Sequence, residues 1–325
     1  MRPFRFTAVT SLDQLGPPGP QTSFIAGGTT VVDLMKLEVM TPDELVAIDQ
    51  LPLRGIREDA GGLRLGALET MSAVAAHPAV AGGYQVISES LLQSASAQLR
   101  NMATIGGNLL QRTRCSYFRD VHSACNKRVP GSGCPAITGE NRMLAILGTS
   151  ASCIATNPSD LAVALVVLDA QLRLRGTGGG VRTVPLRDFY LEPGDRPDRE
   201  NVLQPGELIT EVLVPRPAAG TKTGYVKVRD RASYEFALTS AAVVLNMDGD
   251  RVRKAEVAVG GVGTKPWLLP QVGAALNGRA LDRTNLEAAA SLAANGAKRY
   301  PDNGFKVELI QRTVVRAFSR LGGLV

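Results

Sequence analysis

All four cysteines of this chain lie in one stretch that shows neither helical nor strand periodicity. Residues 111–152 are rich in Arg, Ser, Gly and Pro, and no sustained apolar repeat runs through them. An irregular stretch of this length inside a compact domain is usually functional or tied down by something. We therefore expect an insertion over residues 111–153 that its thiols hold together: Cys115, Cys125, Cys134 and Cys153.

The cysteine spacing leaves three interpretations open. The thiols could be unrelated buried side chains, two disulfides in an oxidising compartment, or one four-thiolate site for zinc or an iron–sulfur cluster. The spacing C-x9-C-x8-C-x18-C contains none of the tight knuckles that structural zinc sites usually have. Nearby cations favour thiolates and a net-anionic cluster: Arg112, Arg114, Arg119, Lys127 and Arg128.

The composition is that of a globular chain, and the length predicts two domains. With 325 residues, 44% hydrophobic and 20% charged, the chain can bury a sizeable core and is not disordered throughout. The net charge of +6 suits an anionic ligand or an acidic partner. We expect no nucleic-acid partner, because the charges are scattered and aromatic residues make up only 5%.

The hydropathy pattern bears on the compartment. No apolar run reaches the roughly 18 residues that a membrane-spanning helix needs, so we expect no membrane span. The first residues, Met1–Phe6, lack the apolar core of a secretory signal, so we expect no signal peptide. The chain would then stay in the cytoplasm or leave it with a partner that carries a signal.

Strands and helices alternate on both sides of the insertion. Short apolar runs predict strands over residues 22–25, 45–48, 63–67, 171–175, 181–185 and 208–214. Helical spacing predicts helices over residues 31–37, 70–77, 84–99 and 161–168, the last capped by Ser159 or Asp160. Residues 215–220 have the composition of a linker.

The last 105 residues have a different order of elements. The pattern predicts a strand over residues 225–229 and a β-hairpin that pairs residues 239–247 with 252–260. Helices are expected over residues 268–276, 285–294 and 306–320. An antiparallel sheet with helices on one face is the architecture that this order predicts, so the fold class is α+β.

Two glycine pairs could bind a dinucleotide. Residues 26–30 read Ala-Gly-Gly-Thr-Thr between a predicted strand and helix, and residues 104–108 read Thr-Ile-Gly-Gly-Asn. Adjacent glycines let backbone N–H groups approach an anion, so two such turns suit the two phosphates of a dinucleotide. Either pair alone could be a simple turn, and neither matches the Rossmann or P-loop pattern.

Five segments together resemble the flavin subunit of the molybdenum hydroxylases. They read FIAGGTTVVDLMK, RNMATIGGNLL, NPSDLAVALVVLDA, YVKVRDRASYEFALTSAAVVL and VAVGGVGTKPW. The resemblance implies a two-subdomain, PCMH-like FAD-binding domain over residues 1–217. It also implies an α+β C-terminal domain of the CO dehydrogenase flavoprotein type over residues 218–325.

The resemblance also implies FAD and the residues that hold it. Residues 26–30 would wrap the pyrophosphate, 104–108 would complete the cradle, and Asp160 would accept hydrogen bonds from ribose or ribityl hydroxyls. From the residues alone, Asp160 could be a helix cap and Lys227 a solvated strand residue. The implied cofactor site is Ala26, Gly27, Gly28, Thr29, Thr30, Thr104, Ile105, Gly106, Gly107, Asn108, Asp160, Ile209 and Lys227.

The insertion resembles that of the flavin subunits of periplasmic aldehyde oxidoreductases, which implies a [4Fe–4S] cluster on the four cysteines. The implied function is electron transfer to an external acceptor within a heterotrimer. Its large subunit would carry molybdopterin and oxidise aldehydes, its small subunit would carry [2Fe–2S] centres, and co-export would make it periplasmic. No catalytic residue is expected in this chain. The alternatives are a free-standing flavin oxidase or reductase and a zinc-stapled scaffold.

Overall fold

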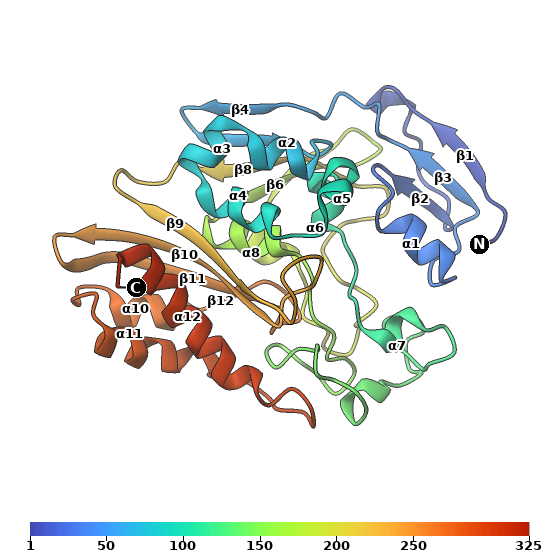
Figure 1. Cartoon of the computed structure of the whole chain (residues 1–325). Helices are drawn as coiled ribbons and strands as arrows, with labels where there is room; N and C mark the ends of the chain where they lie inside the picture. Colours follow the sequence, from blue (N-terminus) through green and yellow to red (C-terminus); the bar gives the residue numbers. More distant parts are fainter. Residues whose placement is uncertain (325) are drawn as a thin grey trace.

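The computed structural model describes residues 1–324 and arranges them around three β-sheets (Figure 1). Two sheets come from the N-terminal two thirds of the chain, and the third comes from the C-terminal third. Helices are distributed through both parts, so the predicted α+β class is confirmed. Among the described residues, no helix is both long and apolar enough to cross a bilayer.

The first sheet is small and parallel. Its strands run in the order β1-β3-β2, and both outer strands pair in parallel with β3. The elements are β1 (Arg5–Ala8), β2 (Thr22–Ile25), helix α1 (Val31–Lys36) and β3 (Glu44–Ala47), with a 3-10 turn at Leu12–Gln14. This unit places residues 26–30 at the carboxyl end of β2, the edge at which open α/β sheets bind ligands.

The second sheet is antiparallel and has the order β4-β5-β8-β6-β7. Its strands are β4 (Ile56–Asp59), β5 (Gly62–Gly66), β6 (Gln171–Arg175), β7 (Val181–Pro185) and β8 (Leu208–Pro215). Its helices are α2 (Met71–Ala76), α3 (Pro78–Gly83), α4 (Gln85–Leu92), α5 (Ala97–Met102), α6 (Ile105–Leu109), α8 (Asp160–Val167) and α9 (Leu186–Phe189). Every residue of α8 is buried, because this apolar helix contacts α4 on one side and β10 and β11 on the other.

The third sheet has the order β12-β11-β10-β9 and is antiparallel. Its strands are β9 (Lys222–Val228), β10 (Thr239–Asp248), β11 (Arg251–Gly260) and β12 (Trp267–Leu268). The helices are α10 (Pro270–Leu276), α11 (Arg283–Ala290) and α12 (Lys306–Gly322), with a 3-10 turn at Ser291–Ala294. These helices cover one face of the sheet, as predicted, while α4 and α8 lie on its other side (Figure 1).

Two expectations about the helices are wrong. The helix predicted over residues 84–99 is two helices, because α4 ends at Leu92 and Ala95 has a positive φ of 49° before α5 begins. Residues 104–108 were predicted as a turn, but Thr104 caps helix α6 and residues 105–108 lie within it. The pattern also missed β1 and β4, because these sheet-edge strands are mostly exposed and carry no apolar alternation.

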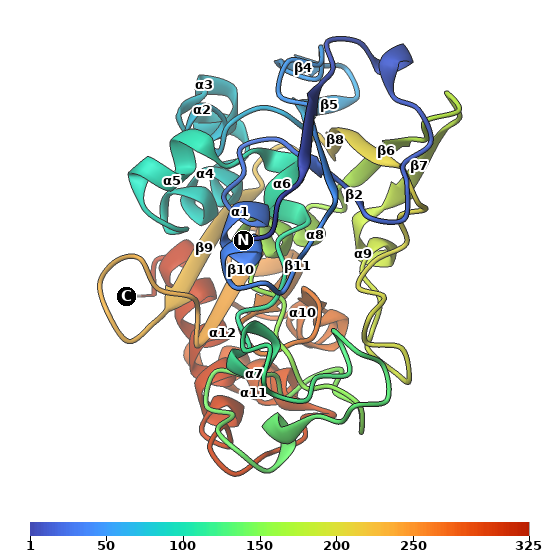
Figure 2. The ribbon, with the colours of Figure 1, turned by 90° about the vertical axis from the view of Figure 1, so that its right-hand side faces the viewer.

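The insertion is as irregular as its composition predicts. It contains only helix α7 (Ser116–Arg119) and a 3-10 turn at Pro135–Ile137. In Figure 2 it occupies the lower part of the molecule, below α1. Asn141 and Asp302 exchange hydrogen bonds of 3.2 and 2.9 Å, which tie the insertion to the C-terminal domain.

Candidate cofactor site

Two cavities meet along the loop that follows β2. One has a volume of about 330 Å³, and Ile209 is among its apolar lining residues. The other has a volume of about 230 Å³ and contains Asp160 and Lys227. Three residues line both cavities: Thr29, Thr30 and Gly107. The two cavities therefore form one elongated site that runs past the loop.

The loop Gly27–Thr30 presents backbone donors that are free. Within residues 1–324, none of its four N–H groups donates a hydrogen bond. Gly28 has a φ of +72°, a left-handed conformation that glycine adopts without strain. Gly27 is packed so closely that a Cβ there would lie 1.9 Å from the carbonyl oxygen of Met102. The loop is therefore held against its neighbour while its N–H groups stay available for an anion.

The segment Thr104–Asn108 differs from the loop, because the N–H groups of Ile105–Asn108 already have partners. The first two N–H groups after Thr104 donate to the backbone carbonyl oxygens of Glu69 and Ala67, at 2.9 and 2.8 Å. The next two donate to the side-chain and backbone oxygens of Thr104, at 3.2 and 2.8 Å. This segment contributes a wall without a side chain at Gly107, and its N–H groups are not free for a phosphate.

Asp160 is buried and accepts three hydrogen bonds from other side chains. Its Oδ2 accepts from Ser94 Oγ at 2.9 Å and from Lys227 Nζ at 2.7 Å, and its Oδ1 accepts from the Tyr225 hydroxyl at 2.6 Å. The cap of α8 is Ser159, and the Lys227 side chain is only 1% exposed. Asp160 is therefore not the helix cap, and Lys227 is not a solvated strand residue. The ion pair between them joins α8 to β9.

The tyrosine in this network stays protonated. Burial, together with the negative charge of Asp160, raises the pKa of Tyr225 well above its usual value. Its hydroxyl is therefore a permanent donor to the carboxylate near neutral pH. The result is a hydrogen-bonded polar wall of the second cavity, which holds Asp160 in one orientation.

The remaining predicted residues divide between the cavity and the core. Ile209 lines the first cavity, as expected. The Ile105 side chain is completely buried and packs in the large core that also contains residues of β5, β6 and β8. Asn108 lines the second cavity and accepts a hydrogen bond from Ser159 Oγ at 2.7 Å.

Two arginines that the sequence assigned to the cysteines also line the cavities. Arg112 lines the first cavity, and Arg114 lines the second. The Arg114 guanidinium lies over the Phe236 ring, 5.0 Å from its centroid. Its Nε is buried and has no hydrogen-bond partner in the part of the chain that the structure describes. The sequence positions of Arg112 and Arg114, close to Cys115, did not indicate that these arginines also line the cofactor cavities.

The four cysteines belong to one apolar cluster, which Phe118 and Tyr300 help to enclose. All four thiols are free. Burial raises the pKa of Cys115 to about 11 and also raises the pKa of Cys134 and Cys153. The disulfide interpretation therefore gains no support, and without a metal the thiols of Cys115, Cys134 and Cys153 stay protonated near neutral pH.

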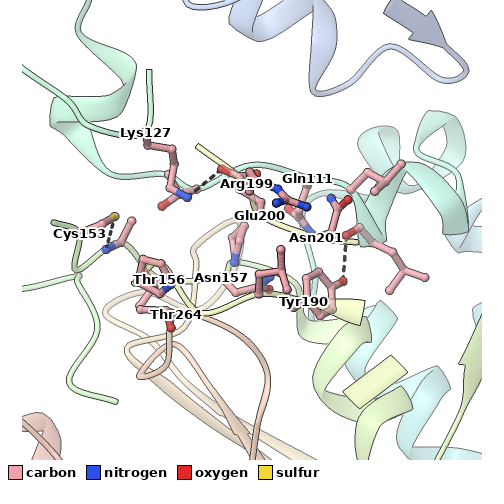
Figure 3. Close-up of a pocket in the computed structure, with 17 residues that line it drawn as sticks. Gln111, Lys127, Cys153, Thr156, Asn157, Tyr190, Arg199, Glu200, Asn201 and Thr264 are labelled. Atoms are coloured by element: carbon pink, nitrogen blue, oxygen red, sulfur yellow. Dashed lines mark hydrogen bonds and ion pairs between the residues drawn. The ribbon is translucent and has the colours of Figure 1, made fainter. Parts of the chain in front are cut away.

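Other groups beside Cys153 favour its thiolate. The charge of Lys127 lowers the pKa of Cys153 against the larger effect of burial. The Ala155 N–H donates to the Cys153 sulfur at 3.4 Å. Figure 3 shows Lys127 pointing to Glu200, whose Oε1 lies 3.0 Å from Lys127 Nζ and which also binds Arg112. Cations and N–H donors of this kind stabilise the form of cysteine that binds metals.

The thiols share a cluster without forming a site for a single ion. Within residues 1–324, no group of three or more His, Cys, Asp or Glu side chains is arranged to hold a metal ion. This arrangement gives the zinc alternative no support.

Comparison with known protein families covers nearly the whole chain. Residues 2–217 match the model of the FAD binding domain in molybdopterin dehydrogenase. Residues 224–321 match the model of the CO dehydrogenase flavoprotein C-terminal domain. The first match contains both glycine segments and the insertion, and the second contains Lys227.

Individual relatives and solved structures agree with these models. The chain is 48% identical over 296 residues to the aldehyde oxidoreductase FAD-binding subunit PaoB of Escherichia coli (strain K12), covering 91% of this chain and 90% of that protein. It is 29% identical to the carbon monoxide dehydrogenase medium chain of Afipia carboxidovorans, covering 88% and 81%. A chain of the reconstituted CO dehydrogenase from Oligotropha carboxidovorans superposes with a TM-score of 0.77 at 25% identity, covering 99% of each chain. The chain therefore belongs to the family of FAD-binding flavoprotein subunits of the molybdenum hydroxylases.

Proposed function

We propose that this chain is the FAD-binding electron-transfer subunit of a molybdenum-dependent aldehyde oxidoreductase. The observation that carries the proposal is the loop Gly27–Thr30, whose free N–H groups face an elongated cavity. The 48% identity to an aldehyde oxidoreductase subunit supports aldehydes as the substrate class of the complex. FAD, when bound, accepts electrons singly or in pairs and passes them on.

The residues fit FAD unequally. The free N–H groups of the loop would bind the pyrophosphate, and Thr29 and Thr30 would add hydroxyl donors. Ile209 would pack on an aromatic ring in the larger, more apolar cavity. Asp160 already accepts from three protein donors, so a sugar or ribityl hydroxyl would use only the remaining lone pair of its carboxylate. Lys227 would act mainly by holding Asp160 in place.

The four cysteines are proposed to bind a [4Fe–4S] cluster. They share one buried apolar cluster, and Lys127 and the Ala155 N–H favour a thiolate at Cys153. Because burial raises three of the thiol pKa values, cluster binding would release protons and strengthen as the pH rises. The cluster would either relay electrons or pin the insertion.

The chemistry on the aldehyde is assigned to another subunit. The chain would receive electrons from a small subunit with [2Fe–2S] centres, which a molybdopterin-binding large subunit would supply while it oxidises the aldehyde to a carboxylic acid. The chain would then deliver the electrons to an external acceptor. Co-export with a signal-bearing partner would make the complex periplasmic, and the cytoplasm is the alternative compartment.

The first experiment measures flavin. Gly28→Val should bring FAD below detection in the purified chain, because valine does not readily adopt the left-handed φ of 72° that the loop has at Gly28. Its Cβ would also press on the side chains of Val32 and Ile25, which would move the loop that faces the cofactor. Gly296→Val is the matched control, since Gly296 has a φ of 78° with open space around it. Normal flavin in Gly28→Val would refute the placement of FAD.

The second experiment measures iron and sulfide together with the visible spectrum. Cys125→Ser should remove iron, and FAD should still be detected. A colourless wild-type chain with zinc would instead support the scaffold alternative. Bleaching of the flavin by an aldehyde in the isolated chain would support the free-standing oxidase or reductase, because the proposed subunit needs its partners to reach the substrate.

A further inference from the structure

The helix that follows the FAD loop is hydrogen-bonded to that loop. The N–H groups of Val32 and Leu34 donate to the carbonyl oxygens of Gly28 and Thr30, each at 3.0 Å. These bonds use the carbonyl side of the loop and leave its N–H groups free. A displacement of α1 is therefore passed directly to the loop that faces the cofactor cavity.

The insertion binds α1 through one carboxylate. Asp33 Oδ2 accepts from Arg114 Nη1 at 2.6 Å and from Arg119 Nη1 at 2.8 Å. Asp33 Oδ1 accepts from Arg119 Nη2 at 3.0 Å, so the Arg119 contact is bidentate. The two arginines stand on either side of the chain turn that starts at Cys115. The position of the Asp33 carboxylate on α1 thus depends on the position of the turn that begins at Cys115.

An apolar contact supports the same link. Leu34, the residue after Asp33, is 1% exposed and belongs to the apolar cluster that contains Cys115 and Cys153. Met40, just beyond α1, packs against this cluster and also lines the larger cofactor cavity. The helix therefore lies between the cysteines and the cavity, with one polar and one apolar contact to the insertion.

We propose that Asp33 is a positioning residue that couples metal binding at the four cysteines to FAD binding at the loop Gly27–Thr30. The inference rests on the proposed function, because it takes both groups as ligands of this chain. Hydrogen bonds from the Glu140 N–H and from Arg128 to Tyr117 also hold the turn after Cys115. The metal would add a fixed point at Cys115 itself, and without it the two arginines would hold Asp33 less firmly. The loop then samples more conformations, and FAD binds more weakly.

The coupling must act in both directions. If the metal strengthens FAD binding by some factor, FAD strengthens metal binding by the same factor. Couplings between sites are typically about 5- to 150-fold, and one charged clamp plus one buried leucine places this one near tenfold. FAD should therefore also slow the loss of iron to a chelator.

The test uses the full-length chain, reconstituted with iron and sulfide or stripped with a chelator. FAD affinity is measured by quenching of flavin fluorescence in each form. In the wild type, stripping should weaken FAD binding about tenfold. In Asp33→Asn, the iron-loaded form should bind FAD as weakly as the stripped wild type, and the ratio between its own two forms should fall to about one. Arg119→Gln should give the same collapse of the ratio and serves as a second variant.

The controls separate coupling from general damage. Asp13→Asn makes the same chemical change at a 92% exposed carboxylate outside both sites, and it should keep the tenfold ratio. Equal FAD affinity in loaded and stripped wild type would overturn the coupling while leaving both cofactors in place. A tenfold ratio that persists in Asp33→Asn and Arg119→Gln would overturn the role of Asp33. Failure of the wild type to bind iron and sulfide would instead refute the proposed cluster.

Discussion

The two glycine segments look alike in sequence and differ in what their backbones have left to offer. In both, a glycine pair stands near a threonine at the edge of a helix. The loop Gly27–Thr30 keeps its four N–H groups free among the described residues, whereas those of Ile105–Asn108 are all used inside the protein. A glycine pair therefore indicates that another group lies close to the backbone. Whether the backbone N–H groups already have partners inside the protein decides whether that group is a ligand or part of the fold.

Each glycine pair contains one glycine that packs closely against another part of the chain. Gly27 packs against the backbone of Met102, two residues before Thr104, with no room for a Cβ. Gly106 packs against Ala67, and a Cβ at Gly106 would lie 3.1 Å from the Ala67 Cβ. The two segments therefore pack against different neighbours, and the following predictions test how their roles differ.

The largest effect on stability should come from breaking the buried ion pair between Lys227 and Asp160. Lys227→Met leaves the buried Asp160 carboxylate without its counter-ion, and such a loss costs about 3–5 kcal/mol. Urea unfolding at pH 7 measures the change. Lys222→Met, an exposed position on the same strand, should cost less than about 0.5 kcal/mol. Equal costs at the two positions would mean that the Lys227–Asp160 ion pair contributes nothing to the stability of the fold.

The next effect compares the two glycine pairs directly. Gly27→Ala forces a methyl group onto the Met102 carbonyl, which should destabilise the fold by about 1–3 kcal/mol and release FAD. Gly107→Ala meets only Thr104 Oγ1, at 3.0 Å, so stability should fall less than in Gly27→Ala. Flavin content should fall only as far as the added methyl group narrows the wall that the two cavities share. Thermal unfolding and flavin content measure the two outcomes. Flavin loss in Gly107→Ala with retention in Gly27→Ala would reverse the comparison.

A smaller pair of changes separates stability from binding. Thr104→Val removes the cap that accepts the Gly107 N–H, at a cost of about 0.5–2 kcal/mol, with FAD affinity nearly unchanged. Thr29→Val removes a hydroxyl that lines both cavities, so FAD affinity should fall while stability stays within about 0.5 kcal/mol. Urea unfolding and flavin-fluorescence titration check both. Matching changes in the two variants would argue that the segments have the same role.

The smallest effect is the pH dependence of the stability that Asp33, on the helix after the loop, contributes. Hydrogen bonds from Arg119, then Arg114, hold the pKa of Asp33 below its usual value. Its stabilising contribution is therefore complete above the unfolded pKa of about 4 and is lost as the pH falls through the lower folded value. Solvent screens this partly exposed carboxylate, so less than about 1 kcal/mol is at stake. Unfolding of wild type and Asp33→Asn between pH 3 and 6 should converge at the acid end.

The local pattern predicted most elements outside the insertion. The strand at residues 171–175 has the predicted bounds, because its side chains alternate between core and solvent. The strand at residues 181–185 also has the predicted bounds, although its first three residues are all exposed. The predicted helix over residues 84–99 failed at Ala95, whose positive φ no periodicity signals. The edge strands β1 and β4 were missed because their exposed residues carry no apolar alternation, and pairing with a neighbouring strand creates them.

The sequence by itself determined the family, the glycine pairs and the confinement of every cysteine to one insertion, because these depend on residue identity and order. Only the tertiary structure decided which N–H groups are free, that Lys227 is buried against Asp160, and that Arg114 and Arg119 meet at Asp33. Each of these contacts joins residues at least 60 positions apart or depends on a partner found elsewhere in the fold. Hydrogen bonding and burial are properties of such pairs, so they arise only when the chain has folded.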